Sequence, residues 1–261
     1  KTGINYRLLP MTRGMISELL TPEEAASHEA LIKEHFYCPD GVRLMNRPAN
    51  YEGGVSKHFK RAEQASNFGR EIGLQYVHAH IRFVEAMAKL GRTEEVWKGL
   101  ETINPIGITK VVSNAQKRQS NAYFSSSDGN FKTRYEAQER FNELSTGQVS
   151  VKGGWRIYSS GPGIYMNQLI SNGLGIRQQA DHLEIDPVLP SSLDGLECSF
   201  VVYEKPVTIR YHLSDQEGTL TVNGNEVNFE SLQNRYRQGG VKIGKEALEA
   251  VLTDGQNLIE V

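Results

Sequence analysis

The apolar pattern of the chain changes its period near residue 177, and this change constrains the fold more than any other feature. Before it, apolar residues recur at three- and four-residue steps, the spacing of amphipathic helices. After it come short runs that alternate apolar and polar residues or are rich in β-branched ones, as strands are. We therefore predict a mainly helical domain over residues 1–177 and a β domain over residues 178–261.

Local signals predict several helices in the first domain. Thr21-Pro22-Glu23-Glu24 is a capping box with proline at the first helical position, so a helix is expected over residues 22–36. A second helix is expected to begin at Leu74 and to stop at Gly91. A third is expected over residues 93–103, which makes a helical hairpin with the second.

A long polar stretch over residues 106–154 follows this hairpin and reads as a connection of the kind that often carries function. Within it, residues 125–130 have the composition of a turn-rich loop and receive no role. The apolar run 164–174 then predicts a buried helix that closes the helical domain.

Strands are predicted in the second domain at residues 182–185, 200–203, 207–211 and 219–222. Asn223-Gly224 is a strong signal for a tight β-hairpin turn. A β-sandwich or jelly-roll-like domain is the expected architecture.

Composition excludes several classes of function. The net charge is −2 and the basic residues are scattered, which argues against nucleic acid as a partner. No apolar run approaches the roughly 18 residues of a membrane span, and the first residues lack the apolar core of a signal peptide, so a cytoplasmic location is expected. The chain opens on Lys1, as if cut from a longer protein.

The segment 152–163 is rich in glycine and small hydroxyls and precedes the last helix. Free N–H groups at a helix N-terminus attract anions, so a phosphate could bind at Ser160 and Gly161. Taken alone, a tight turn with Ser160 as helix cap is the commoner explanation.

Two histidines lie on the helix expected from Leu74. An imidazole at His78 could donate to phosphate, although a structural histidine is the commoner case at such positions. His80 lies two residues on and so faces another side of the helix. No partner completes a metal site with either histidine, and we predict no metal.

Four planar or aromatic side chains suit sugar hydroxyls and the faces of pyranose rings: Arg118, Asn121, Tyr123 and Trp155. Each has an ordinary alternative, which is core packing for the aromatic residues and a solvated surface charge for Arg118.

Five segments occur in an order that resembles the cellobiose phosphorylase family of inverting glycoside phosphorylases: residues 70–78, 103–105, 155–163, 174–177 and 183–190. The most specific of them are Gly175-Ile176-Arg177 ahead of Ile185-Asp186-Pro187, and Glu71 seven residues ahead of His78. In detail the sequence is most similar to the 1,2-β-oligoglucan phosphorylases.

The resemblance implies part of an (α/α)6 barrel over residues 1–177 and a C-terminal, jelly-roll-like β-sandwich over residues 178–261. It implies that His78, Ser160 and Gly161 hold phosphate and that Arg70 and Glu71 contact the leaving sugar. Arg118, Asn121, Tyr123 and Trp155 are further candidates for substrate binding.

Three departures from the cellobiose enzymes put the acceptor specificity in doubt: Ser160 in place of threonine, Pro162 after Gly161, and Asn121-Ala122-Tyr123 in place of Glu-Pro-Tyr. The aspartate that serves the family as general acid, in an Asp-Trp-Asn type motif, is absent from these residues. We therefore assign no catalytic residue to this chain and expect it to be inactive alone.

The expected reaction is cleavage of a β-glucosidic bond, with β-1,2 as the favoured linkage, by inorganic phosphate to give α-glucose 1-phosphate. Phosphate is a co-substrate, and no cofactor is expected. The expected partners are the oligosaccharide and the remaining N-terminal part of the same enzyme, and a homodimer would cover apolar helix faces that an incomplete barrel exposes. The alternatives are a module of a cyclic glucan synthase, a related hydrolase, or a non-catalytic carbohydrate-binding or structural fragment.

Overall fold

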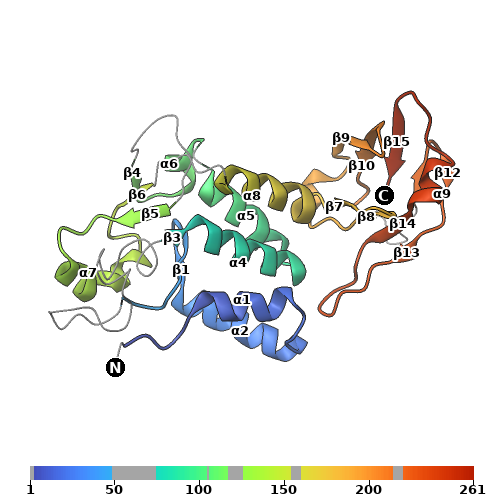
Figure 1. The fold of residues 1–261 in the computed structure, drawn as a ribbon. Helices are drawn as coiled ribbons and strands as arrows, with labels where there is room; N and C mark the ends of the chain where they lie inside the picture. Colours follow the sequence, from blue (N-terminus) through green and yellow to red (C-terminus); the bar gives the residue numbers. More distant parts are fainter. Residues whose placement is uncertain (1–2, 49–74, 105, 117–125, 154–159, 214–219) are drawn as a thin grey trace. The chain divides into compact units, whose positions relative to one another are not determined.

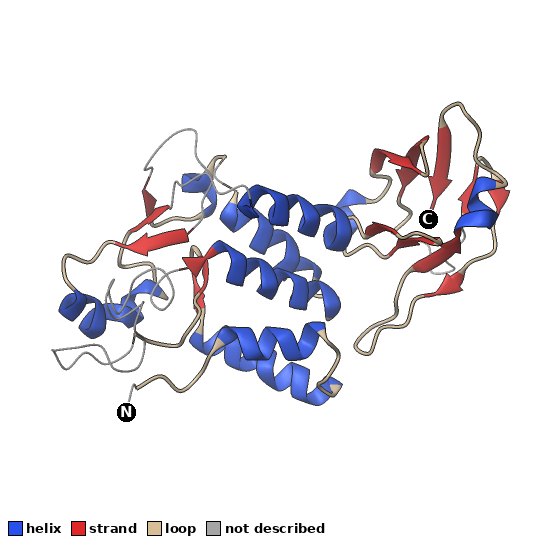
Figure 2. Cartoon of the chain, in the orientation of Figure 1, coloured by secondary structure: helices blue, strands red, loops and turns tan. Residues whose placement is uncertain are grey.

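The computed structural model describes residues 3–48, 75–104, 106–116, 126–153, 160–213 and 220–261 (Figure 1). The chain divides into two compact units. The first comprises Lys1–Leu90 and Glu95–Met166, and the second comprises Gly91–Glu94 and Asn167–Val261. Helices dominate the earlier part of the chain and strands the later part, as the change of pattern predicted (Figure 2).

Four helices make the framework of the first unit: α1 (Leu8–Ile16), α2 (Pro22–His35), α4 (Val77–Lys89) and α5 (Thr93–Ile103). Helix α4 packs against α1, and α5 lies on its other side (Figure 1). The side chains of Ile81, Val84 and Met87 on α4 are fully buried. Helix α4 is therefore the central element of the helical core.

The helix starts signalled by capping residues are confirmed. In α2 the Thr21 hydroxyl accepts a hydrogen bond from the Glu24 N–H at 3.2 Å, and the Glu24 carboxylate accepts one from the Thr21 N–H at 2.8 Å. Helix α5 covers residues 93–103 as expected. The hairpin turn ahead of it contains Gly91 at φ +72°, the left-handed conformation that glycine adopts without strain.

Helix α4 begins later than predicted. Gln75 and Tyr76 form strand β3 (Gln75–Tyr76), which pairs with Ser127 and Ser126 of strand β5 (Ser126–Gly129). The predicted start at Leu74 is therefore wrong by three residues, since α4 begins at Val77. A helical apolar period cannot reveal pairing with a segment 50 positions away.

The stretch 106–154 is largely structured rather than a long connection. It contains α6 (Ile108–Val111), β4 (Ala115–Gln116), β5, α7 (Arg134–Arg140), the 3-10 helix η1 (Phe141–Leu144) and β6 (Val151–Gly153). The predicted loop at residues 125–130 is wrong because most of it is strand β5. The polar composition of residues 125–130 is typical of a loop and did not indicate a strand. In the structure, β5 is an inner strand of a four-stranded sheet in the order β3-β5-β6-β4.

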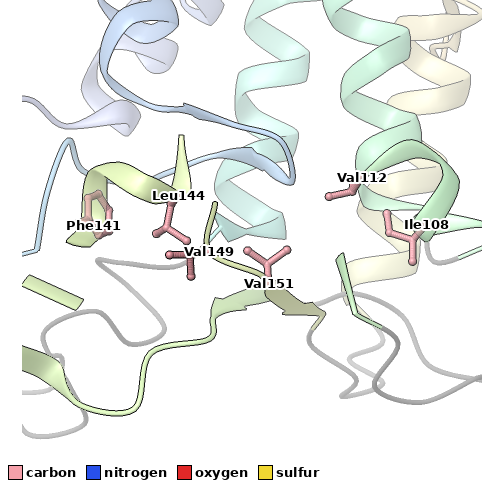
Figure 3. Close-up of a cluster of buried hydrophobic side chains, with 6 residues drawn as sticks. All are labelled: Ile108, Val112, Phe141, Leu144, Val149 and Val151. Carbon is pink, nitrogen blue, oxygen red and sulfur yellow. The ribbon is translucent and has the colours of Figure 1, made fainter. Parts of the chain in front are cut away.

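A separate hydrophobic cluster supports this part of the unit (Figure 3). It consists of Ile108, Val112, Phe141, Leu144, Val149 and Val151. Cys38 of the hairpin β1 (Tyr37–Cys38) and β2 (Gly41–Val42) packs against the same cluster. The cluster therefore joins the end of α2 to the α7–η1 segment.

Helix α8 (Ser160–Gln168) continues into one π-helical turn, Leu169–Gly173. It starts four residues before the predicted run, with Gly161-Pro162-Gly163 inside its first turn. The predicted buried helix is buried in part: Gln168 and Leu174 are 1% and 8% exposed, whereas Met166 is 48% exposed. Ile164 and Tyr165 are half-buried and pack against the cluster of Val77, Ile81 and Ile103.

Two sheets make up most of the second unit. One has the order β12-β11-β15-β10-β9 and the other the order β13-β14-β8-β7. Their strands are β7 (Ile176–Gln178), β8 (His182–Ile185), β9 (Glu197–Val202), β10 (Lys205–Arg210), β11 (Thr221–Val222), β12 (Asn225–Glu226), β13 (Glu230–Ser231), β14 (Val241–Gly244) and β15 (Asn257–Glu260). A short 3-10 helix (Ser191–Leu193) and α9 (Lys245–Glu249) complete the unit.

The strand predictions agree with this arrangement apart from their ends. Residues 182–185 are strand β8, while Tyr203 has φ +45° and belongs to the turn after β9. Asn223 and Gly224 have φ of +52° and +78° and join β11 to β12, so the predicted hairpin is confirmed.

An ion-pair network joins the two strands that begin the second unit. Arg177 on β7 donates to Glu184 on β8, with 2.5 Å between Nε and Oε2, and its Nη2 lies 3.1 Å from Asp186 Oδ2. Gly175 has φ +75°, and a Cβ atom there would lie 2.2 Å from the Asp186 carbonyl carbon. The Gly-Ile-Arg and Ile-Asp-Pro motifs are thus explained by the architecture of the β7–β8 hairpin.

Candidate functional site

The N-terminal turns of α4 and α8 carry the predicted phosphate-binding residues, and both helices contribute to one hydrophobic cluster. Val77 and Ile81 of α4 form a buried cluster with Ile103, against which Ile164 and Tyr165 of α8 pack. His78 directly follows Val77, and Gly161 lies three residues before Ile164. The fold therefore brings together two helices whose candidate residues are about 80 positions apart in sequence.

His78 is half-buried at the first turn of α4. Its ring stacks on that of Tyr76, with centroids 5.3 Å apart and an interplanar angle of 10°. Burial, assisted by the nearby Arg82 charge, lowers the pKa of His78 below its usual value. Both effects favour the neutral imidazole, in which one ring nitrogen carries a hydrogen and the other is an acceptor.

His80 has a structural role instead. Its Nδ1 accepts a hydrogen bond from the Val42 N–H at 3.2 Å, and its Nε2 lies 2.8 Å from the Gly99 carbonyl oxygen, which assigns the proton to Nε2. Burial lowers the pKa of His80 to about 4. Both ring nitrogens are engaged inside the core, so this histidine cannot reach a substrate.

Glycines fit closely around the His80 ring. Gly41 has φ +113°, and a Cβ atom there would lie 2.7 Å from His80 Nδ1. A Cβ atom at Gly99 would lie 2.7 Å from Val84 Cγ2 and 3.5 Å from His80 Nε2. The ring thus ties the β1–β2 hairpin, α4 and α5 together.

Gly161 differs from these glycines because its surroundings do not require glycine. Its φ is not left-handed, and no described atom lies within 4 Å of the place where a Cβ would stand. The same is true of Gly163, while Pro162 between them has no N–H to donate. No described residue therefore blocks the approach of a ligand to the Gly161 backbone.

The other candidates lie outside the described residues: Arg70, Glu71, Arg118, Asn121, Tyr123, Trp155 and the Ser160 side chain. Among the residues that are described, no three His, Cys, Asp or Glu side chains are grouped so that they could hold a metal ion. No helix within the described ranges is long and apolar enough to cross a membrane.

Sequence reasoning overlooked a buried ion pair near these helices. Arg43 is 1% exposed and Asp40 is 5% exposed, and Arg43 Nη2 lies 2.9 Å from Asp40 Oδ1. Asp40 lies in the turn between β1 and β2. Its only local signal was the i,i+3 spacing to an arginine, which is too common in proteins to indicate burial.

Comparisons with known proteins agree with the resemblance noted in the sequence. Residues 175–260 match the model of the glycoside phosphorylase C-terminal domain. The chain is 55% identical over 248 residues, 95% of its length, to 1,2-beta-oligoglucan phosphorylase of Listeria innocua. It is 30% identical over 126 residues, 48% of its length, to cyclic beta-(1,2)-glucan synthase NdvB of Rhizobium meliloti.

The chain spans only a small part of both relatives, 23% of the Listeria protein and 4% of the Rhizobium protein. The resemblance to the C-terminal part of glycoside phosphorylases is nevertheless confirmed, because it now rests on a domain match and on identity along nearly the whole chain.

Proposed function

We propose that this chain, whose residues 175–260 match the model of the glycoside phosphorylase C-terminal domain, is the C-terminal part of an inverting glycoside phosphorylase. The enzyme would cleave β-1,2-linked gluco-oligosaccharides with inorganic phosphate and release α-glucose 1-phosphate. The observation that carries the proposal is the 55% identity over 95% of the chain to a 1,2-beta-oligoglucan phosphorylase.

The chemistry of this reaction explains which groups the chain would supply. An inverting hydrolase needs one carboxylic acid for the leaving oxygen and a second carboxylate to activate water. Phosphate is already a charged nucleophile, so the second carboxylate is replaced by groups that bind the anion and aim it. No general acid is assigned among the residues of this chain.

We assign phosphate binding to His78, Ser160 and Gly161. The hydrophobic cluster that α4 and α8 share, and the absence of described atoms beside Gly161, support this assignment. A neutral His78 would donate one N–H to a phosphate oxygen, and the dianion would then favour protonation of the ring. The Gly161 N–H and the positive end of the α8 dipole would also bind the phosphate dianion.

The finer architecture belongs to the same proposal. Residues 1–177 would form part of an (α/α)6 barrel, and residues 178–261 a β-sandwich. Arg70, Glu71, Arg118, Asn121, Tyr123 and Trp155 would contact the oligosaccharide. A homodimer and a cytoplasmic location stay predictions from the sequence.

A cyclic glucan synthase module is the second candidate, favoured by the similarity to the Rhizobium protein. That similarity covers 48% of the chain at 30% identity, against 95% at 55% for the phosphorylase, so the phosphorylase is preferred.

The test is a reaction of the full-length protein with β-1,2-gluco-oligosaccharides, with and without inorganic phosphate, followed by ³¹P and ¹H NMR. We expect α-glucose 1-phosphate to form only with phosphate. Release of glucose without phosphate would show a hydrolase, and formation of cyclic glucan from a sugar nucleotide would show a synthase. Either outcome would overturn the proposal.

A further inference from the structure

A pocket of about 480 Å³ lies in the first unit between the end of α2 with the β1–β2 hairpin and the α7–η1 segment. Of the predicted binding residues that the structure describes, neither His78 nor Gly161 lines it. Its volume falls in the range of small-molecule sites, about 300–1,000 Å³.

The wall formed by α2 and the residues after it is held by contacts of its own. The His35 ring stacks on Tyr6, with centroids 4.6 Å apart and planes 14° apart. The side-chain carbonyl of Asn46 accepts hydrogen bonds from the N–H groups of Asn5 and Tyr6, each at 3.1 Å. Arg43 reaches the pocket from the core, with its guanidinium on Asp40.

The opposite wall is fixed to the first through the core. Phe141 belongs both to the pocket lining and to the hydrophobic cluster of Figure 3, against which Cys38 of β1 packs. Ion pairs of Arg140 with Glu136 and Glu143, each at 2.6 Å, stabilise α7 and its junction with η1. The pocket is therefore built from two supported walls and is pre-formed.

The lining is polar, with its charges balanced. Arg43 and Arg47 are offset by Glu34 and Glu139, Gln138 adds a polar amide, and the side-chain amide of Asn142 has a donor and an acceptor. Balanced charge disfavours a polyanion, and a lining so rich in polar groups disfavours an apolar ligand. The aromatic rings of Tyr37 and Phe141 add apolar faces next to these groups.

We propose that this pocket binds a short neutral saccharide, because an amide and carboxylates beside aromatic rings match the hydroxyls and apolar faces of a sugar. The pocket goes beyond the proposed function, since its described lining includes neither His78 nor Gly161 and saccharide binding there does not require phosphorolysis.

The test is hydrogen–deuterium exchange of the full-length protein with and without the β-1,2-linked disaccharide of glucose, titrated through the millimolar range. We expect slower exchange in peptides that cover residues 34–47 and 138–145. Gln138→Ala and Asn142→Ala should each weaken the concentration dependence of this protection about two- to tenfold, the loss of one neutral hydrogen bond.

Gln148→Ala is the matched control, because Gln148 is exposed nearby and does not line the pocket. It should leave the protection unchanged. Protection that survives both pocket substitutions, or that is absent from these peptides, would overturn the proposal. Protection by inorganic phosphate alone would also overturn it, since the pocket would then be an anion site. Exchange reports on these peptides separately, so the outcome does not depend on whether the enzyme is a phosphorylase.

Discussion

Arg237 holds the carboxylate of Asp186 with both arms of its guanidinium, at 2.7 Å from Nη1 to Oδ1 and 2.9 Å from Nη2 to Oδ2. The two residues are 51 positions apart, and the Gly240 N–H donates to the same carboxylate at 2.9 Å. Together with Arg177, they join the β7–β8 hairpin to the segment before β14. This carboxylate is therefore a central stabilising group of the second unit.

Asp186→Asn should lower the stability of the second unit by about 2–4 kcal/mol, because it leaves two arginines facing a neutral amide in a nearly buried place. Thermal unfolding of the full-length protein measures this effect. Asp254→Asn is the control: Asp254 pairs with Lys205 at a fully exposed position, and its loss should leave the unfolding temperature unchanged.

The same pair predicts a pH dependence. Burial raises the pKa of Asp186, but hydrogen bonds from Arg237 and Arg177 outweigh burial and bring the pKa below its usual value. The stabilisation is therefore complete above the pKa of an unfolded aspartate, about 3.9, and is lost as the pH falls through the lowered pKa. A stability difference between wild type and Asp186→Asn that persisted in stronger acid would contradict the assigned role.

Two glycines with nearly the same φ allow backbone strain and collision to be measured separately. Gly175 and Gly195 have φ of +75° and +76°, but only at Gly175 would a Cβ atom meet other atoms, the nearest at 2.2 Å. Gly195→Ala should cost about 1 kcal/mol from left-handed strain alone, and Gly175→Ala at least about 3 kcal/mol. Thermal unfolding of the two variants gives the comparison, and equal losses would show that the close approach of Asp186 is unimportant.

The buried His80 predicts that the first unit loses stability in weak acid. Burial lowers the pKa of His80 to about 4, whereas an unfolded histidine protonates near pH 6.5. The unfolding free energy should therefore fall between about pH 6.5 and pH 4, by up to about 3 kcal/mol, with a shallower fall in His80→Gln. NMR titration of the wild-type ring provides an independent check, since a His80 resonance that titrates near pH 6.5 would refute the prediction.

His78→Ala tests phosphate binding directly. In the full-length enzyme it should reduce the rate about 30- to 1000-fold, or about 2–4 kcal/mol, because a donor to the reacting phosphate is lost. The loss should appear in the phosphate dependence far more than in the oligosaccharide KM, which steady-state kinetics with each substrate varied can separate. A purely structural His78 would instead lower the unfolding temperature and leave the phosphate KM unchanged.

Gly161→Ala tests the α8 side of the predicted phosphate site, because it should change phosphate binding without changing the stability of the fold. The open space and ordinary φ at Gly161 mean that alanine should leave the unfolding temperature unchanged or slightly higher. Its methyl group would nevertheless enter the space next to the predicted phosphate, so the phosphate KM should rise several-fold. Gly163→Ala is the matched control on the same helix, and an equal rise in both variants would argue against a role for Gly161.

The two histidines of α4 show how far sequence reasoning reached into the candidate site. Spacing alone placed His78 and His80 on different sides of one helix but could not say which side faces the core. Gly41 and Gly99 close around His80, while His78 stays half-buried beside Tyr76. The hydrogen bond that holds His80 in the core comes from the Val42 N–H, 38 positions away in sequence. The spacing of residues within the helix therefore could not indicate which histidine is buried.

Sequence alone determined the features whose cause lies within a few residues: the Thr21 capping box, the Gly91 stop, the Asn223-Gly224 hairpin, and the change from helices to strands. Only the tertiary structure decided that α4 begins after a strand, that residues 126–129 pair in a sheet, and that Arg237 reaches Asp186. The physical reason is the range of the interactions. Capping and turn preferences act through neighbouring backbone groups, whereas strand pairing, buried ion pairs and pockets depend on segments that only folding brings together.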